Sequence, residues 1–201
     1  MTRLGYVMAT YFAVMGVAVA SILSVPVKLL WNASASTPLG LYDLAAPNGL
    51  KVGDLVAVRP PKPLADFMVR RGYIGRGVPL LKSVAALPGQ QVCRVGRTVT
   101  VDGVVLGEAQ ERDRRGRMLL VWQGCRRIAP DQIFLMNPSV HDSLDGRYFG
   151  PLPRAAVIGL AMPLYTDPHG NSHFVWHGLF AERPIPLLPN IATETSHAAD
   201  R

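Results

Sequence analysis

The chain has 201 residues, of which 49% are hydrophobic and 17% are charged, and its formal net charge is +7. This length allows one globular domain with a short additional segment, and the composition excludes a chain that is mainly disordered. Two cysteines are present, too few to make a zinc site by themselves.

The N-terminal segment is apolar, with no charged side chain between Leu4 and Val27. A helix of that length would reach about 36 Å, enough to cross a hydrocarbon core of about 30 Å. We therefore expect residues 1–31 to be a single-pass membrane anchor, with the N-terminus in the cytoplasm and the body of the chain outside. A cleaved signal peptide is the alternative, because Ala18-Val19-Ala20 matches a small-x-small cleavage site.

Residues 32–165 are predicted to form one β-rich domain, because short runs of β-forming residues alternate with Gly, Pro and Asp. Asp102-Gly103 between two valine-rich runs favours a two-residue hairpin. The expected fold is mainly β, an antiparallel barrel-like domain after one transmembrane helix, with a short helix over Pro63–Arg71. The predicted strands are 54–58, 80–86, 91–95, 98–101, 104–106, 118–122, 132–136 and 156–160.

Residues 166–201 are rich in His, Pro and Ser and are expected to be a loosely ordered tail. His169, His173 and His177 are spaced as metal ligands on a helix can be, but Pro168 argues against a helix there. No metal or cofactor is predicted.

A basic cluster lies at Arg112, Arg114, Arg115 and Arg117. We expect a solvated loop, and no nucleic-acid partner, because no aromatic residue is interleaved with these arginines. The two cysteines, at 93 and 125, can pair in an oxidising compartment, although the sequence does not show that they meet.

Ser36 is the first candidate catalytic residue. Pro38 fixes one backbone angle and Gly40 permits an unusual one, so the serine is expected on a rigid bend. The same pattern also occurs in ordinary turns.

Lys82 is the second candidate, because it is the only charge in the apolar run from Val78 to Leu87. In a strand, Leu80, Lys82 and Val84 share one face, and lost hydration lowers the pKa of the amine toward the range useful for a base. The alternative is a lysine whose stem packs on the surface while its amine reaches water.

The third candidate is the segment that begins at Ser143, in which Asp145 and Arg147 alternate with a hydroxyl. Such a segment can orient a lysine by hydrogen bonds while Asp145 pairs with Arg147. The alternative is an ordinary polar turn, which Asp-Gly favours.

Three motifs in this order resemble the type I signal peptidases, and more closely their conjugative-transfer branch, the TraF-type pilin peptidases. The motifs are Ser-x-Pro-x-Gly-x-Tyr from Ser36, Lys82 followed by Leu87-Pro88-Gly89, and Ser-x-Asp-Gly-Arg-Tyr-Phe-Gly-Pro from Ser143. Ser83 and Thr37 depart from the general enzymes, which commonly have Arg and Met there, and this favours the specialised branch.

The resemblance implies a serine peptidase that is anchored in the bacterial inner membrane by a single span and whose catalytic domain faces the periplasm. Ser36 matches the nucleophile and Lys82 the general base, while the Ser34 hydroxyl and the Ser36 amide match the oxyanion donors. Ser143, Asp145 and Arg147 match the residues that support the lysine.

The implied substrate is a pilin precursor, which would be cut or cyclised, and other proteins of the conjugation apparatus are expected partners. A non-catalytic anchored β-domain that scaffolds a conjugation or secretion channel is the alternative, with the basic loop as its docking surface.

Overall fold

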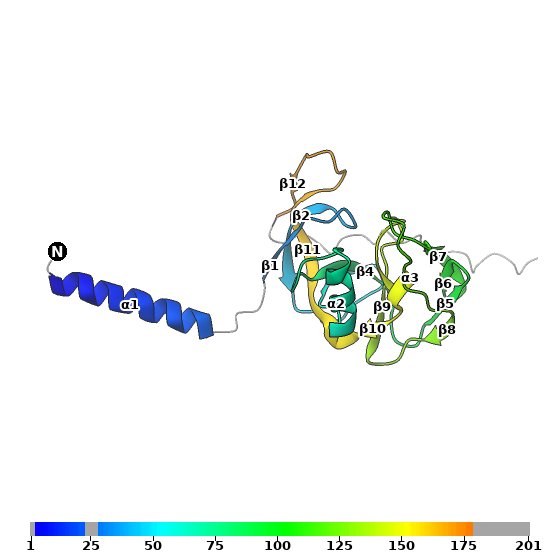
Figure 1. Cartoon of the computed structure of the whole chain (residues 1–201), viewed down its shortest axis with the longest axis horizontal. Coiled ribbons are helices and arrows are strands. Elements are labelled where there is room, and N and C mark those ends of the chain that lie inside the picture. Colours follow the sequence, from blue (N-terminus) through cyan, green and yellow to red (C-terminus); the bar gives the residue numbers. More distant parts are fainter. Residues whose placement is uncertain (1–2, 23–27, 179–201) are drawn as a thin grey trace, which may run out of the picture.

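The structure is a computed structural model, and it describes residues 3–22 and 28–178 (Figure 1). The described residues form an antiparallel β-body with two sheets and short helices, preceded by one longer helix. The helices are α1 (Arg3–Ile22), α2 (Lys62–Arg70), α3 (Gly146–Phe149) and a 3-10 turn (Arg154–Ala156). The strands are β1 (Leu29–Asn32), β2 (Leu39–Ala45), β3 (Leu55–Val58), β4 (Leu80–Ala86), β5 (Gln91–Val95), β6 (Thr98–Val101), β7 (Val104–Glu108), β8 (Gly124–Arg127), β9 (Gln132–Leu135), β10 (Leu152–Pro153), β11 (Val157–Asp167) and β12 (Val175–Trp176).

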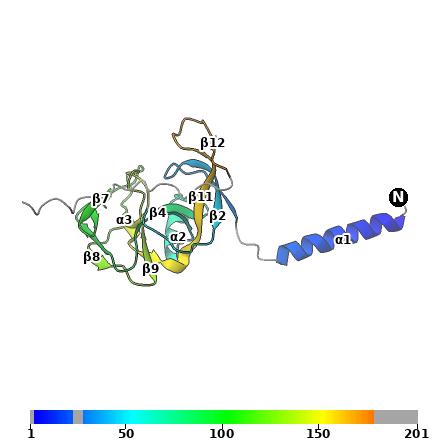
Figure 2. The same cartoon turned by 180° about the vertical axis from the view of Figure 1, so that it is seen from behind.

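The larger sheet has the strand order β1-β2-β11-β3-β4-β9-β10, with β12 paired to β11. Every strand pair in it is antiparallel, as predicted. Among the described strands, β1 and β10 lie at the two ends of this order and do not pair with each other, so the sheet is not a closed barrel. The smaller sheet, β7-β6-β5-β8, lies at the end of the body away from β1 and β2, as Figures 1 and 2 both show.

Hydrophobic clusters cover both faces of β4 and explain its central place. Leu80 and Val84 belong to the cluster that α2 covers with Met68, whereas Leu81 belongs to a second cluster with Tyr42. A third cluster lies between the smaller sheet and the neighbouring parts of β4 and β9. Because alternate residues of a strand face opposite sides, Lys82 faces the same side as Leu80 and Val84.

Most of the predicted elements are present. The short helix and the Asp102-Gly103 hairpin form as expected, and both turn residues have the positive φ that a two-residue hairpin favours, at 47° and 85°. The strand predicted over 118–122 does not form, apart from an isolated bridge between Met118 and Arg112. Instead, Trp122 alone turns into the core.

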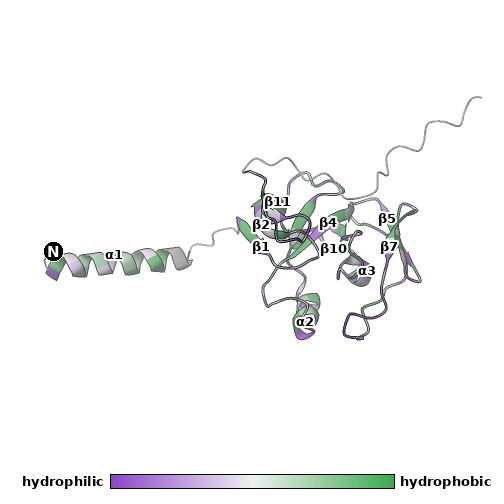
Figure 3. Ribbon diagram, turned by 90° about the horizontal axis from the view of Figure 1, so that it is seen from above, coloured by the Kyte–Doolittle hydropathy of each residue, from purple (hydrophilic) through white to green (hydrophobic). Residues whose placement is uncertain are grey.

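The expected membrane-spanning helix is not found. The apolar N-terminal segment forms α1, which ends at Ile22, and Figure 3 shows that most of it is hydrophobic or neutral. Within residues 3–22 and 28–178, none of the helices combines the length and the apolar character that a membrane crossing needs. Residues 29–31 of the expected anchor lie in β1, where Trp31 stacks on Phe174. The expected helix continued to Val27, and residues 23–27 lie outside the described part of the chain.

The expected tail begins inside the larger sheet. β11 continues through Thr166 and Asp167, and Phe174 also stacks on Tyr165. Asp167 is buried and accepts hydrogen bonds from three backbone N–H groups of the loop that follows, at His169, Asn171 and Ser172. Residues 166–178 therefore belong to the body, whereas 179–201 lie outside the described residues.

Candidate active site

Ser36 lies in the hairpin loop between β1 and β2, and the side chain of Asn32 organises this loop. The Asn32 amide donates to the backbone carbonyls of Ser34, Thr37 and Pro38 at 2.9, 3.1 and 3.0 Å. Its oxygen accepts from the Ser34 N–H at 3.0 Å. This short-range bonding holds the bend that presents Ser36, so the rigid loop expected from Pro38 also depends on an asparagine that the sequence analysis did not single out.

Gly40 follows in β2 and lies against β11. A Cβ atom at this position would come within 2.2 Å of the Tyr165 carbonyl oxygen, and φ is +138°. Only glycine fits both this backbone angle and this space. It lets β2 approach β11 closely, next to the loop that carries Ser36.

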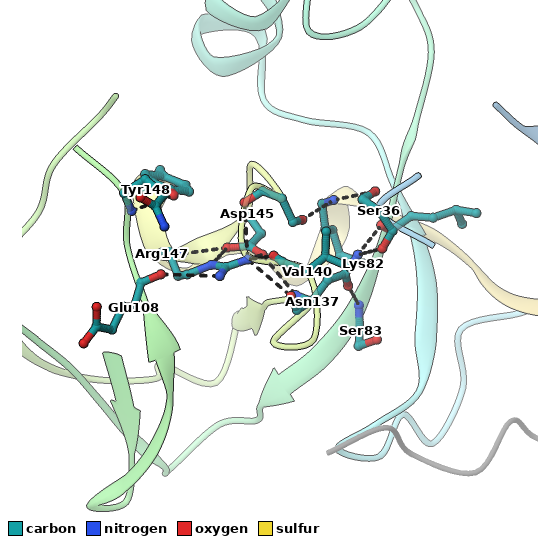
Figure 4. A network of polar contacts seen from close by, with 12 residues as sticks. Ser36, Lys82, Ser83, Glu108, Asn137, Val140, Asp145, Arg147 and Tyr148 are labelled. Atoms are coloured by element: carbon teal, nitrogen blue, oxygen red, sulfur yellow. Dashed lines mark hydrogen bonds and ion pairs between the residues drawn. The ribbon is translucent and has the colours of Figure 1, made fainter. Parts of the chain in front are cut away.

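Lys82 lies in the middle of β4, and its amine points toward Ser36 (Figure 4). The Nζ atom is 3.1 Å from Ser36 Oγ and 3.0 Å from Ser143 Oγ. The residue is only 3% exposed, which overturns the surface alternative in which the amine reaches water. Two hydroxyl groups thus meet a buried amine from segments that are distant in sequence.

Burial is the main influence on this amine, and it lowers the pKa of Lys82 to about 8. The Asp145 carboxylate opposes the shift by raising the pKa, and the Arg147 guanidinium lowers it further. With a pKa near 8, about a tenth of the amine is neutral at pH 7, compared with about four ten-thousandths for an ordinary lysine. The site therefore holds a lysine that can accept a proton near neutral pH.

Asp145 and Arg147 form a fully buried ion pair beside Ser143, with both side chains at 0% exposure. The two Asp145 oxygens accept from Arg147 Nε at 2.9 Å and Nη2 at 2.8 Å. Asp145 also caps α3 by accepting from the Arg147 N–H. The carboxylate accepts hydrogen bonds from the Arg147 side chain and from the backbone N–H groups of Arg147 and Asn137, and not from Lys82. It therefore acts on the lysine through its negative charge and by holding the loop that carries Ser143.

Arg147 fixes the loop that carries Ser143. Its guanidinium donates to the backbone carbonyls of Val140 at 2.6 Å and Asn137 at 3.2 Å, and more weakly to those of Ser143 and Glu108, both at 3.4 Å. Because one planar group binds the carbonyl of Ser143 itself and those of two residues shortly before it, the hydroxyl beside Lys82 is kept in place. Figure 4 shows this network reaching from Glu108 to Ser36.

Asn137 is a second residue that the sequence analysis missed. Its amide donates to the Ser36 carbonyl at 2.7 Å, and its side-chain oxygen accepts from the Ser83 N–H at 2.9 Å. Its own N–H donates to Asp145 at 3.0 Å. One buried asparagine therefore joins the Ser36 loop, the Lys82 strand and the Asp145 carboxylate.

Ser34 lies beside the candidate nucleophile, as the motif implied. Its Oγ is 3.2 Å from Ser36 Oγ and donates to Asn32 at 2.9 Å. A role as an oxyanion donor stays a prediction. The six predicted site residues thus lie in one connected cluster, although only Ser36 and Ser143 contact Lys82 by hydrogen bonds that the structure shows.

Two cavities meet at Ser36. The first has a volume of about 610 Å³ and reaches from Lys82 and Ser143 to α2 and to the arginine-rich segment 110–119. The second, of about 450 Å³, lies beside Thr37, Asn137 and the loop after Asp167. The basic segment expected as a solvated loop is therefore also a wall of the cavity that holds the buried amine.

In the smaller sheet, a disulfide links the neighbouring strands β5 and β8. It joins Cys93 and Cys125, which lie directly opposite each other in the antiparallel pair. The sequence had left this pairing open. The bond closes the stretch of chain that contains the arginine-rich wall, so both ends of that stretch are tied to one sheet.

The family follows from comparison with known proteins. A family model described as signal peptidase, peptidase S26, matches residues 1–165, and the chain belongs to this family of serine peptidases. Its relatives include a probable conjugal transfer protein TraF of Sinorhizobium fredii, 40% identical over 67% of this chain and 76% of that protein. The conjugal transfer protein TraF of Agrobacterium tumefaciens is 36% identical over 67% of this chain and 81% of that protein.

Among solved structures, a signal peptidase I from Enterococcus faecalis is similar, with 20% identity and a TM-score of 0.36. The match covers 56% of this chain and 97% of that chain.

Proposed function

We propose that this chain is a serine endopeptidase in which Ser36 is the nucleophile and Lys82 the general base, and that it processes a pilin precursor for conjugative transfer. The contact of 3.1 Å between the buried Lys82 amine and Ser36 Oγ carries the proposal. Membership of the signal peptidase family supports the peptidase class, and the conjugal transfer relatives support the role in conjugation.

The reaction begins with neutral Lys82. The amine takes the proton of Ser36 as Oγ attacks the scissile carbonyl carbon, and a tetrahedral oxyanion forms. The Lys82 ammonium then gives that proton to the departing amine, and an ester between Ser36 and the substrate remains. Ser143, at 3.0 Å from Nζ, holds the lysine so that its free electron pair is directed at Ser36.

The oxyanion needs hydrogen-bond donors before the ester can form. The Ser36 N–H and the Ser34 hydroxyl fill this role in the proposal, with Ser34 Oγ 3.2 Å from Ser36 Oγ. Water then attacks the ester to release an acid. If the substrate's own N-terminal amine attacks instead, the product is a ring.

The disulfide supports action in an oxidising compartment, which for a conjugation peptidase is the periplasm. Disulfides persist in secreted and periplasmic proteins and are rare in the bacterial cytosol. Cys93 and Cys125 are paired here. We propose that the catalytic domain works on the periplasmic side of the inner membrane.

The test is intact mass spectrometry of a pilin precursor co-expressed with the full-length chain. Ser36→Ala and Lys82→Met are each expected to abolish the mass change of the precursor. The mass also separates the two outcomes, because cyclisation gives a product one water lighter than the hydrolysed acid.

Two matched variants control for general damage. Ser172→Ala and Lys62→Ala change exposed residues outside both cavities and are expected to leave processing intact. Normal processing by either Ser36→Ala or Lys82→Met, at wild-type protein level, would refute the assignment. Loss of processing in Arg114→Glu with normal processing in Ser36→Ala would instead favour a scaffold.

A further inference from the structure

The wall of the larger cavity is strongly basic. We define the arginine wall as the five arginines that line this cavity, whose lining also includes Lys82. They are Arg71, Arg112, Arg114, Arg115 and Arg117. The lining also contains two carboxylates, Asp113 and Asp142, so three positive charges remain in excess even without Lys82. A cleft lined by one sign of charge concentrates ligands of the opposite sign.

Some of these arginines already have charged partners. Arg117 pairs with Asp113 at 2.7 Å, and Arg114 pairs with Asp142. Arg71 donates to a backbone carbonyl of the same wall, at Met118. These contacts neutralise part of the wall and attach it to the rest of the body.

Arg112 and Arg115 differ from the others. Arg112 donates one hydrogen bond to the Gly116 carbonyl at 2.8 Å, and its guanidinium forms no ion pair among the described residues. Within residues 28–178, the Arg115 side chain has neither a hydrogen bond nor an ion pair. A guanidinium offers five N–H donors, so both residues keep donors for a ligand.

The wall is fixed before any ligand binds. Asp113 accepts from the Tyr73 hydroxyl at 2.6 Å and from the backbone N–H groups of Arg115 and Arg117 at 2.9 and 2.8 Å. Arg117 in turn donates to the Arg71 carbonyl at 3.0 Å. These bonds hold the backbone of residues 113–117 against the end of α2, so this backbone is already in place before a ligand binds.

The smaller cavity also borders Ser36, but it lacks this basic character. It is lined by Asp167 and contains no arginine or lysine. The two cavities share Ala35, Ser36 and Val140. A peptide lying across Ser36 would thus have a basic environment on one side of the scissile bond and not on the other.

From this asymmetry we infer that the arginine wall binds the carboxylate of an acidic side chain in the substrate, on only one side of the scissile bond. The inference rests on the proposed peptidase function and adds a specificity to it. Arg115 and Arg112 are the residues that would hold the carboxylate, through two parallel N–H···O bonds from a planar guanidinium. An Asp or Glu within a few residues of the cleaved bond is then a recognition element of the substrate.

The experiment uses internally quenched peptides that span the processed bond identified by mass spectrometry. The peptides are acetylated and amidated, and Glu replaces Gln at one position at a time on either side of the bond. We expect kcat/KM to be about fivefold higher for Glu than for Gln on one side, to be equal on the other, and the preference to shrink at high salt.

Arginine variants tie the preference to the wall. Arg115→Ala and Arg112→Ala are expected to reduce the ratio of kcat/KM for the Glu and Gln peptides toward one. Arg115→Glu is expected to reverse it. Arg127→Ala, an exposed residue of β8 outside both cavities, is the matched control and should keep the wild-type ratio.

The possible results distinguish failure of the acidic specificity from failure of the proposed peptidase function. Ser36-dependent cleavage with no Glu preference, or with the same preference on both sides of the bond, would overturn the acidic specificity and leave the peptidase intact. An unchanged ratio in both Arg115→Ala and Arg112→Ala would also overturn it. If none of the peptides is cleaved in a Ser36-dependent manner, the peptidase assignment itself fails.

Discussion

Asn137 and Ser36 are 101 residues apart in sequence, and the Asn137 amide donates a 2.7 Å hydrogen bond to the Ser36 carbonyl. The same side chain accepts from the Ser83 N–H, next to Lys82. A third residue, which touches neither Ser36 Oγ nor Lys82 Nζ, therefore ties the Ser36 loop to the Lys82 strand. Asn137 is a positioning residue in the proposed mechanism.

Asn137→Ala is expected to lower kcat by about ten- to a hundredfold with little change in KM, because misplaced reacting groups cost turnover more than binding. The pH at half-maximal activity should stay near that of the wild type, since Lys82 remains buried. Steady-state kinetics as a function of pH measures both quantities. A wild-type kcat in a folded Asn137→Ala protein would contradict the positioning role.

Activity is expected to rise with pH through the pKa of Lys82, which burial lowers to about 8. The neutral amine is the base, so kcat/KM should increase about tenfold per pH unit well below 8 and level off above it. A pH–rate profile measured with a neutral peptide tests this. A profile that is flat between pH 6 and 9 would exclude Lys82 as the base.

The same group predicts how stability depends on pH. The folded state lowers the pKa of Lys82 from 10.5 to about 8, so between these values the unfolded chain binds more protons. The free energy of unfolding therefore gains a contribution that increases as pH rises through this window. Urea unfolding at several pH values should show a smaller increase in Lys82→Met, where the titrating group is gone.

Arg147→Ala is expected to lower the free energy of unfolding by about 3–5 kcal/mol, because it leaves Asp145 charged and buried without its partner. Both side chains of this pair are at 0% exposure. The matched control is the exposed pair of Lys62 and Asp66, where the lysine side chain is 86% exposed. Lys62→Ala should cost less than about 1 kcal/mol in the same urea titration. Equal losses in the two variants would contradict the assigned importance of the buried pair.

Removing the disulfide with Cys93→Ser and Cys125→Ser together is expected to cost about 3–4 kcal/mol, from the chain entropy of a loop with a sequence separation of 32. The two cysteines are directly opposite in antiparallel strands, so the serines fit the same space. Thermal unfolding with and without a reductant measures the effect. A reductant should lower the Tm of the wild type and leave that of the double variant unchanged.

Local sequence patterns predicted much of the β-body. The runs around Val56, Val92, Val99 and Ile133 are strands in the structure because their apolar residues alternate or are fully buried. β8 escaped prediction because all four of its residues, from Gly124 to Arg127, are exposed and carry no hydrophobic signal. The apolar run 118–122 was predicted to be a strand but does not form one, because Trp122 is the one residue of this run that is buried.

The order of the three motifs predicted that Ser36, Lys82 and Ser143 belong to one site. Asn137 and the arginine wall could not be found in this way, because their roles depend on which segments meet in space. A polar residue after a strand, or a run of arginines, has the same sequence signal whether it faces solvent or a reacting serine. Asn32 gave a clearer local signal, as an asparagine at the start of a turn.

The contacts that define the site also couple its chemistry to folding. Lys82 meets Ser36 across 46 residues and Ser143 across 61, and no local segment contains two of the three. A nascent or partly unfolded chain therefore has a serine of ordinary reactivity and a lysine that is solvated and protonated. The proposed Ser–Lys chemistry therefore requires the folded body, because only the folded chain brings these three distant side chains together.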